Sequence, residues 1–132
     1  MRYFGSLVLI TGLALAAGGC RDQGPKQDNS PSQTREQLKG RLDAADALAT
    51  PGKRVDALKK VAEDAADAGE ADIAQKAVEK ITIPGTKDEL AAACALKIAS
   101  RGDTKAAKAL ADLISTPGKK EKVMEKIAKG EQ

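Results

Sequence analysis

The sequence predicts an all-α protein in which about six helices stack as a short αα-solenoid. Pro-Gly pairs begin at Pro51, Pro84 and Pro117, which are equally spaced at 33, and Gly69 and Gly102 keep the same interval. Between these points apolar residues recur every three or four positions, as on one face of a helix, and no segment alternates as a strand does. A repeat of this length is typical of arrays in which stacked helix pairs share one core. Chance recurrence of the turn residues is the alternative interpretation.

The first predicted helix covers Thr34 to Ala49 and stands alone before the first Pro-Gly pair. The first repeat then has a helix from Lys53 to Ala68 and a second from Glu70 to Ile81, with Gly69 as the left-handed residue between them. The apolar residues on one face of each helix are predicted to be buried. They are Leu38, Leu42, Ala45 and Leu48, then Val55, Leu58, Val61, Ala62 and Ala65, and then Ile73, Ala77, Val78 and Ile81.

The second repeat follows the same pattern. Thr86 and Glu89 have the spacing of a capping box at a helix start, Gly102 ends that helix, and Asp103 is predicted to cap the next one. A last unpaired helix is predicted from Lys119 to Lys129. The predicted core residues of these three helices are Leu90, Ala91, Cys94, Ala95 and Ile98, then Ala106, Ala107, Leu110 and Ile114, and finally Val123, Met124 and Ile127.

The N-terminal residues have the pattern of a secretory signal peptide. The basic residue Arg2 precedes an apolar run from Phe4 to Ala17, and two glycines follow before Cys20. A transmembrane anchor is the alternative, but the run is shorter than the ~20 residues that a spanning helix needs. Residues 21–35 hold two prolines and no aliphatic side chain, so we expect a solvated tether that cannot form a core.

The ending Ala17-Gly18-Gly19-Cys20 resembles the lipobox of bacterial lipoproteins. The resemblance implies cleavage before Cys20, with a diacylglycerol and an N-acyl chain such as palmitate attached to that cysteine, and no cofactor is expected besides this lipid. It also implies a place in the bacterial cell envelope, where Arg21 after the cysteine favours the outer membrane, facing the periplasm, in a Gram-negative organism. The predicted organisation is therefore a signal peptide (1–19), a lipid anchor and flexible linker (20–35), and a helical repeat domain (36–132).

Small residues of the two repeats resemble those of tetratricopeptide (TPR) repeats. The matching residues are Ala66, Gly69-Glu70, Ala74 and Ala77 in the first repeat and Ala99, Gly102-Asp103 and Ala107 in the second, with proline at the repeat end. The resemblance covers residues 36–132 and implies TPR-like helical hairpins that bind other proteins.

The side chains of the chain argue against an enzyme. There is no His, which excludes histidine acid–base chemistry and histidine metal ligands, and the two aromatic residues, Tyr3 and Phe4, lie in the predicted signal peptide. Cys94 lies between alanines on an apolar helix face, so we expect a buried small hydrophobe rather than a nucleophile. The five carboxylates between residues 63 and 72 lack the loop spacing of a calcium site and are predicted to form a solvated acidic turn.

A membrane-tethered protein–protein interaction or scaffold module of the envelope is the function that these features predict. Two alternatives remain, an exclusion-type surface lipoprotein of a mobile element and a purely structural spacer. The expected partners are the membrane, through the lipid, and an envelope protein, while a homo-oligomer also remains open. Nucleic acid is not expected as a partner because the net charge is only +3. The lysine-rich last helix is predicted to be a solvated cap, with anionic lipid as the alternative contact.

One apolar side chain falls outside the predicted core. At 100° per residue, Leu96 lies about 140° around its helix from Ala91. Leu96 therefore either packs on a neighbouring repeat or contributes to a surface that binds a partner. The predicted interaction surface consists of Asp56, Lys59, Glu63, Glu89, Ala92 and Leu96.

Overall fold

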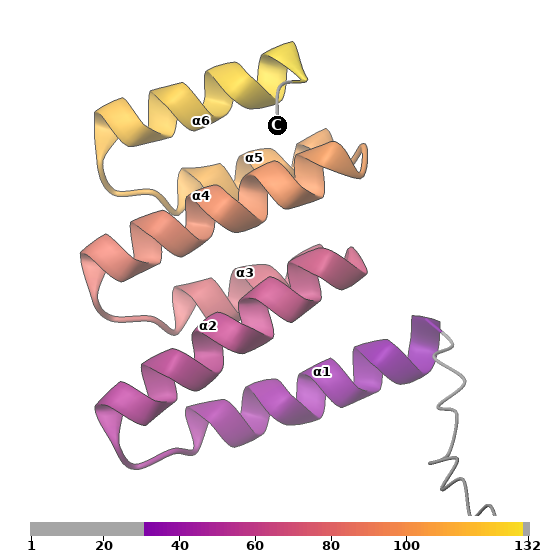
Figure 1. Cartoon of the computed structure of the whole chain (residues 1–132), viewed down its shortest axis with the longest axis vertical. Coiled ribbons are helices and arrows are strands. Elements are labelled where there is room, and N and C mark those ends of the chain that lie inside the picture. Colours follow the sequence, from indigo (N-terminus) through magenta and orange to yellow (C-terminus); the bar gives the residue numbers. More distant parts are fainter. Residues whose placement is uncertain (1–30, 131–132) are drawn as a thin grey trace, which may run out of the picture.

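The computed structural model describes residues 31–130, which form six helices and no strand (Figure 1). The predicted all-α class is therefore confirmed for this part of the chain. The helices are α1 (Pro31–Asp46), α2 (Pro51–Ala68), α3 (Ala71–Glu79), α4 (Pro84–Ser100), α5 (Thr104–Asp112) and α6 (Pro117–Lys129).

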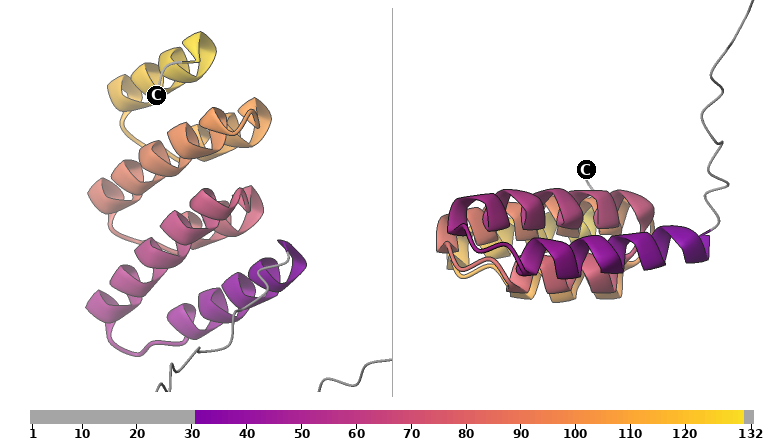
Figure 2. Two further views of the ribbon diagram at one scale, coloured as in Figure 1. Left: turned by 45° about the vertical axis from the view of Figure 1, so that its right-hand side comes forward. Right: turned by 90° about the horizontal axis from the view of Figure 1, so that it is seen from below.

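The six helices form two layers. Helices α2, α4 and α6 contact one another in that order and form the first layer, and α1, α3 and α5 form the second. Figure 2, seen from below, shows the two layers as two rows. Contacts join only helices that are near in the chain, so the domain grows from α1 at one end to α6 at the other (Figure 1).

The three helices of the first layer each begin at a proline. Pro51, Pro84 and Pro117 lie in the first turn, where the missing N–H needs no partner and the fixed φ suits a helix. The residues before them are extended, with φ between −85° and −81°, as a following proline requires. The starts predicted at Lys53 and Lys119 are therefore late, because the Pro-Gly pairs open the helices instead of forming a turn before them.

Glycines follow the C-terminal ends of α2 and α4, and an aspartate caps the start of α5. Gly69 and Gly102 have φ values of +80° and +91°, the left-handed conformation that was predicted for Gly69, and Gly102 follows the end of α4 as predicted. Asp103 caps α5 as predicted, because its Oδ1 accepts a hydrogen bond of 2.9 Å from the backbone N–H of Ala106. The capping box predicted at Thr86 is wrong, since α4 begins at Pro84 and its N-cap residue is Ile83.

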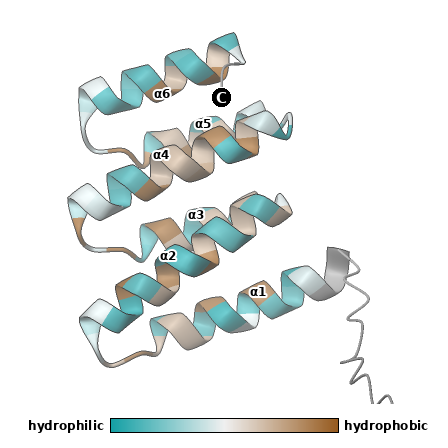
Figure 3. Ribbon diagram, in the orientation of Figure 1, coloured by the Kyte–Doolittle hydropathy of each residue, from teal (hydrophilic) through white to brown (hydrophobic). Residues whose placement is uncertain are grey.

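Residues one repeat apart hold equivalent positions in the core. Leu58 and Ala91 are both buried, as are Ala62 with Ala95 and Ile81 with Ile114. In Figure 3 hydrophobic residues recur along the helices between hydrophilic ones. The burial of matching residues at matching places explains why the apolar pattern repeats at the same interval as the helix starts.

A few predicted core residues are less buried than expected. Val55, Ala106 and Met124 are half-buried and pack against the core. Leu48 was predicted to be buried but is 37% exposed, because its side chain lies beside an open groove that no described helix covers.

Helix α1 begins earlier and ends earlier than predicted, at Pro31 and Asp46 rather than Thr34 and Ala49. Residues 31–35, predicted as the end of the tether, are therefore helical. The Arg35 guanidinium lies 2.9 Å from Glu70 Oε2 and 3.2 Å from Asp72 Oδ2, so this segment is paired with the start of α3. The sequence did not reveal this early start of the helix because residues 31–35 carry no aliphatic side chain.

Candidate functional site

The predicted interaction surface lies on the outward side of the first layer, on α2 and α4. Its members are equivalent pairs, each separated by one repeat: Asp56 with Glu89, Lys59 with Ala92, and Glu63 with Leu96. Asp56, Glu63 and Glu89 are exposed, whereas Lys59, Ala92 and Leu96 are half-buried. Asp56 and Glu63 lie about 140° to 160° around α2 from the fully buried Leu58, and so point away from the second layer.

Leu96 has both of the properties that the sequence left open. Its side chain packs against the hydrophobic core, yet part of it stays accessible on the outward side of α4. Figure 3 shows a more hydrophobic visible face on α4 than on α2. The equivalent residue of α2 is the exposed Glu63, so the two helices offer the same geometry with different chemistry.

Cys20, the predicted lipidation site, lies outside the described residues, together with the predicted signal peptide and most of the tether. Among residues 31–130, no helix is both long enough and apolar enough to cross a membrane.

The acidic residues near the end of α2 are paired across helices. Asp64 Oδ2 lies 2.6 Å from Arg41 of α1, and Asp67 Oδ1 lies 2.8 Å from Lys97 of α4. The hydrogen bond to Asp67 raises the pKa of Lys97. Exposed ion pairs of this kind each contribute only ~0 to 1 kcal/mol, so they add little to the stability of the fold.

Cys94 is a buried thiol in the centre of the stack. Its Sγ lies 3.6 Å from the carbonyl oxygen of Ala62, across the contact between α4 and α2. Loss of solvation on burial raises the pKa of Cys94 to about 12. A thiol with this pKa stays protonated at neutral pH, so it behaves as the small hydrophobe that was predicted.

Asp88 is a buried carboxylate that the sequence analysis missed. It lies on α4, and its side chain holds the loop before α6: it accepts hydrogen bonds from the Thr116 hydroxyl (2.6 Å) and from the backbone N–H groups of Ser115 (2.7 Å) and Thr116 (3.0 Å). These bonds, led by the one from the Thr116 hydroxyl, lower the pKa of Asp88. The available signal was the break in the repeat, because the equivalent residue of α2 is the apolar Val55.

The lysines of α6 lie mostly at the surface. Lys120 pairs with Asp112 of α5 at 2.7 Å, and Lys129 pairs with Glu125 at 2.6 Å within the helix. Lys122 and Lys126 are exposed. This distribution agrees with the solvated cap that was predicted for the last helix.

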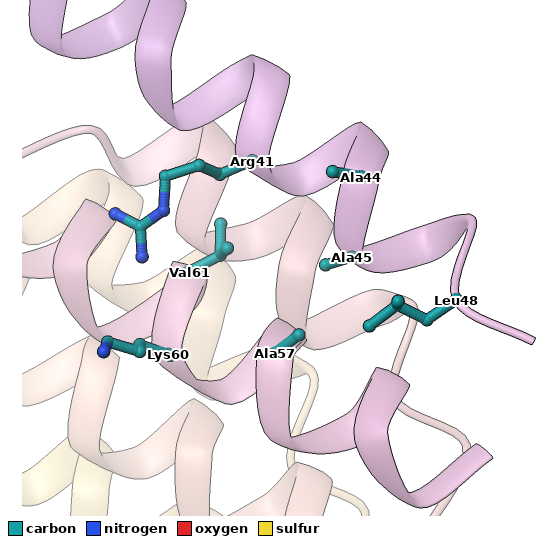
Figure 4. A pocket seen from close by; sticks show the side chains of 7 residues that line it. All are labelled: Arg41, Ala44, Ala45, Leu48, Ala57, Lys60 and Val61. Atoms are coloured by element: carbon teal, nitrogen blue, oxygen red, sulfur yellow. The ribbon is translucent and has the colours of Figure 1, made fainter. Parts of the chain in front are cut away.

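A groove lies between α1 and α2, at the end of the stack opposite α6 (Figure 4). Its volume is about 270 Å³, and its lining is mostly apolar. We call it the α1–α2 groove and define it by Arg41, Ala44, Ala45, Leu48, Ala57, Lys60 and Val61. The sequence analysis did not predict this groove.

No group of three or more His, Cys, Asp or Glu side chains within residues 31–130 has an arrangement that could hold a metal ion. Comparison of the chain with protein-family models, curated proteins and solved structures gave no match.

Proposed function

We propose that this chain is a bacterial lipoprotein that is tethered to an envelope membrane through Cys20 and acts as a protein–protein interaction or scaffold module. The N-terminal pattern supports the tether, because an apolar run ends in small residues directly before a cysteine. Several acyl chains on one residue give stable membrane attachment, whereas a single chain binds reversibly. On this proposal the protein faces the periplasm from the outer membrane of a Gram-negative organism.

The helical domain is, in this proposal, a short TPR-like αα-solenoid. Three features support it: helix starts at Pro51, Pro84 and Pro117, left-handed glycines at matching places, and contacts restricted to neighbouring helices. Arrays of this type present extended surfaces to partners. A binding function therefore needs no cofactor beyond the lipid on Cys20.

The observation that carries the binding function is the outward side of α2 and α4. Asp56, Lys59 and Glu63 give α2 a charged surface, and Ala92 and Leu96 place an apolar centre beside it on α4. A partly accessible leucine with charges around it is typical of a small protein-binding surface, in which an apolar centre is surrounded by a polar rim.

A non-catalytic role agrees with the chemistry of the described side chains. The Cys94 thiol is buried and protonated, and the Asp88 carboxylate is occupied by three hydrogen bonds that hold a loop. Neither group has the accessibility that a nucleophile or a general base needs.

Lipidation is tested by replacing Cys20. We expect Cys20→Ser to remain uncleaved and to lose incorporation of a palmitate analogue, because its thiol is the acceptor. Cys94→Ala is the matched control, since it removes the other cysteine and should label as the unmodified chain does. Equal labelling of Cys20→Ser and the unmodified chain contradicts the proposal.

The interaction surface is tested by Leu96→Glu in the full chain. We expect proximity labelling in membranes to lose those neighbours that depend on Leu96, while helicity and thermal unfolding stay close to those of the unmodified chain. Lys105→Glu, an exposed change on α5 in the second layer, is the control and should keep the same neighbours. If Leu96→Glu lowers the free energy of unfolding by several kcal/mol, Leu96 belongs to the core and this surface is wrong. Unchanged labelling favours a structural spacer.

A further inference from the structure

The two ends of the helix stack are complementary halves of one hairpin. Within the described chain, α2 pairs with α3 and α4 pairs with α5, each as a first-layer helix followed by a second-layer helix. The stack begins with the second-layer helix α1, which no described first-layer helix precedes. It ends with the first-layer helix α6, which no described second-layer helix follows.

The α1–α2 groove is the space that a preceding first-layer helix fills elsewhere in the stack. Its lining residues on α1 are Arg41, Ala44, Ala45 and Leu48, and the equivalent residues one repeat later are Ala74, Ala77, Val78 and Ile81. All four of these later residues are buried where α3 packs on α2. On the first hairpin half, Arg41, Ala44 and Leu48 are exposed and Ala45 is buried, and among the described residues no helix corresponding to α2 lies there.

Leu48 shows this difference most clearly. The equivalent residues, Ile81 and Ile114, are 1% and 4% exposed, whereas Leu48 is 37% exposed. In Figure 4 the Leu48 side chain points along the groove toward Ala57 of α2. The described residues of a single copy therefore leave this large apolar side chain partly exposed.

Helix α6 has apolar residues that are less buried than the equivalent residues of α2 and α4. Met124 is equivalent to Leu58 and Ala91, and Ala128 is equivalent to Ala62 and Ala95. Those four residues are fully buried, but Met124 is half-buried and Ala128 is exposed. The edge that α2 and α4 bury against α3 and α5 is therefore partly uncovered on α6.

We propose that copies of this chain associate head to tail, with α6 of one copy seated in the α1–α2 groove of the next. The occupant of the groove is thus a second copy of the same chain. Helix α6 then stands toward the next copy's α1 as α2 stands toward α3, which brings Met124 to Leu48 and Ala128 to Ala44. This association goes beyond the proposed function and does not depend on lipidation of Cys20.

Charge complementarity supports this register. Between α2 and α4, Lys97 lies among the acids Asp67 and Glu63, whose charges act on it. In the head-to-tail pair, the position of Lys97 is held by Asp64 of α2, which also pairs with Arg41 of its own chain, and the position of Glu63 by Lys129 of α6, which also pairs with Glu125. Both signs are reversed, so the contact is again attractive.

The loop bond of Asp88 has a counterpart at the same junction. Asp88 accepts the Thr116 hydroxyl bond across the contact between α4 and α6. The equivalent residues at the junction of two copies are Glu121 on α6 and Thr50 before α2, and Thr50 makes no capping bond with its side chain. A carboxylate and a hydroxyl donor therefore meet where the repeat places such a pair.

Arg41 stands where the later repeats have alanine, and the length of α6 leaves room for it. Helix α6 has 13 residues and ends at Lys129, whereas α2 has 18. The last turn of α2, which covers the start of α3, thus has no counterpart in α6. A head-to-tail contact uses two different surfaces, so it produces an open series of copies unless the rotation closes a ring.

The test uses two differently tagged full-length chains expressed together in membranes, one with Leu48→Cys and one with Met124→Cys. A short bismaleimide should give an adduct that carries both tags, several-fold above the background of chains without a new cysteine. Two Leu48→Cys chains should stay near that background, and so should Leu48→Cys with Lys105→Cys, because Lys105 lies at the start of α5 whereas Leu48 lies beyond the end of α1. No adduct above background overturns the proposal. A predominant adduct between two Leu48→Cys chains also overturns it, because that adduct indicates a symmetric contact.

A charge reversal tests the register. Asp64→Lys on the Leu48→Cys chain places two lysines together and should lower the adduct yield at least several-fold. Lys129→Asp on the Met124→Cys chain should then restore the yield, because the pair is again of opposite sign. A yield that does not respond to Asp64→Lys, or that Lys129→Asp fails to restore, overturns the proposed register.

Discussion

Three equivalent apolar residues allow the role of each position in the stack to be measured in one experiment. Leu48, Ile81 and Ile114 hold the same place in successive repeats and each follows a second-layer helix, but their exposed fractions are 37%, 1% and 4%. Truncation of each to alanine removes the same number of carbon atoms. We therefore expect the loss of stability to follow burial in the tertiary structure rather than residue type.

The expected magnitudes follow from the buried area. Each buried methylene contributes about 0.8 kcal/mol, so three lost carbons correspond to ~2.4 kcal/mol at Ile81, before the cavity term is added. With that term, Ile81→Ala and Ile114→Ala should each cost ~2 to 5 kcal/mol. Leu48→Ala should cost about 1 kcal/mol, because the side chain is already partly solvated and water fills the space that it leaves. A domain of this size is stabilised by only ~5 to 15 kcal/mol, so either isoleucine change removes a large share.

The assay is denaturant unfolding of the fragment 21–132, followed by circular dichroism at low concentration, where copies are separate. The midpoint should fall strongly for Ile81→Ala and Ile114→Ala and slightly for Leu48→Ala, at an unchanged denaturant dependence. The reasoning is refuted if Leu48→Ala destabilises the fragment as much as Ile81→Ala. A loss below ~1 kcal/mol at Ile81 also refutes it, since that value is less than the transfer term alone.

Two further predictions concern titratable groups. Because burial raises the pKa of Cys94 to about 12, this thiol should react with a disulfide reagent far more slowly at pH 8 in the folded fragment than in denaturant; equal rates would contradict its burial. The pKa of Asp88 is lowered by its bond from Thr116, so this carboxylate stabilises the folded state above its ordinary value of 3.8, and the contribution is lost as pH falls through the lower folded value. Asp88→Asn should therefore unfold more easily than the unmodified fragment at pH 7, and its melting temperature should fall less between pH 5 and pH 2; an equal fall in both would be inconsistent with this role.

For the charged groups of the candidate site, the sequence predicted which side chains are exposed but not which of them form ion pairs. The outward positions of Asp56, Glu63 and Glu89 follow from helix period alone, and the structure places them at the surface. The pairing of Asp64 with Arg41 and of Asp67 with Lys97 could not be predicted, because these partners lie on different helices. Such pairs depend on how two helices are rotated relative to each other, and this rotation cannot be read from the sequence of either helix alone.

Asp88 shows a second limit of the same kind. Aspartate on an exposed helix face and aspartate buried against a loop look alike in sequence, because both occupy one position in the helix period. The difference arises from Ser115 and Thr116, which lie in the loop between α5 and α6 and are distant from Asp88 in the sequence. Only the packed structure brings these N–H and O–H donors to the carboxylate.

By itself the sequence determined the helix class, the repeat interval, the left-handed glycines and nearly all of the buried residues, because these depend on local backbone preference and on the period of one helix face. The tertiary structure decided what happens at the ends. Leu48 and Ile81 hold the same place in the repeat, yet one is open and the other is buried, because burial requires a neighbouring helix and α1 has none before it among the described residues. The repeat pattern predicts which positions carry apolar side chains, and the place of each helix in the stack decides whether those side chains are buried.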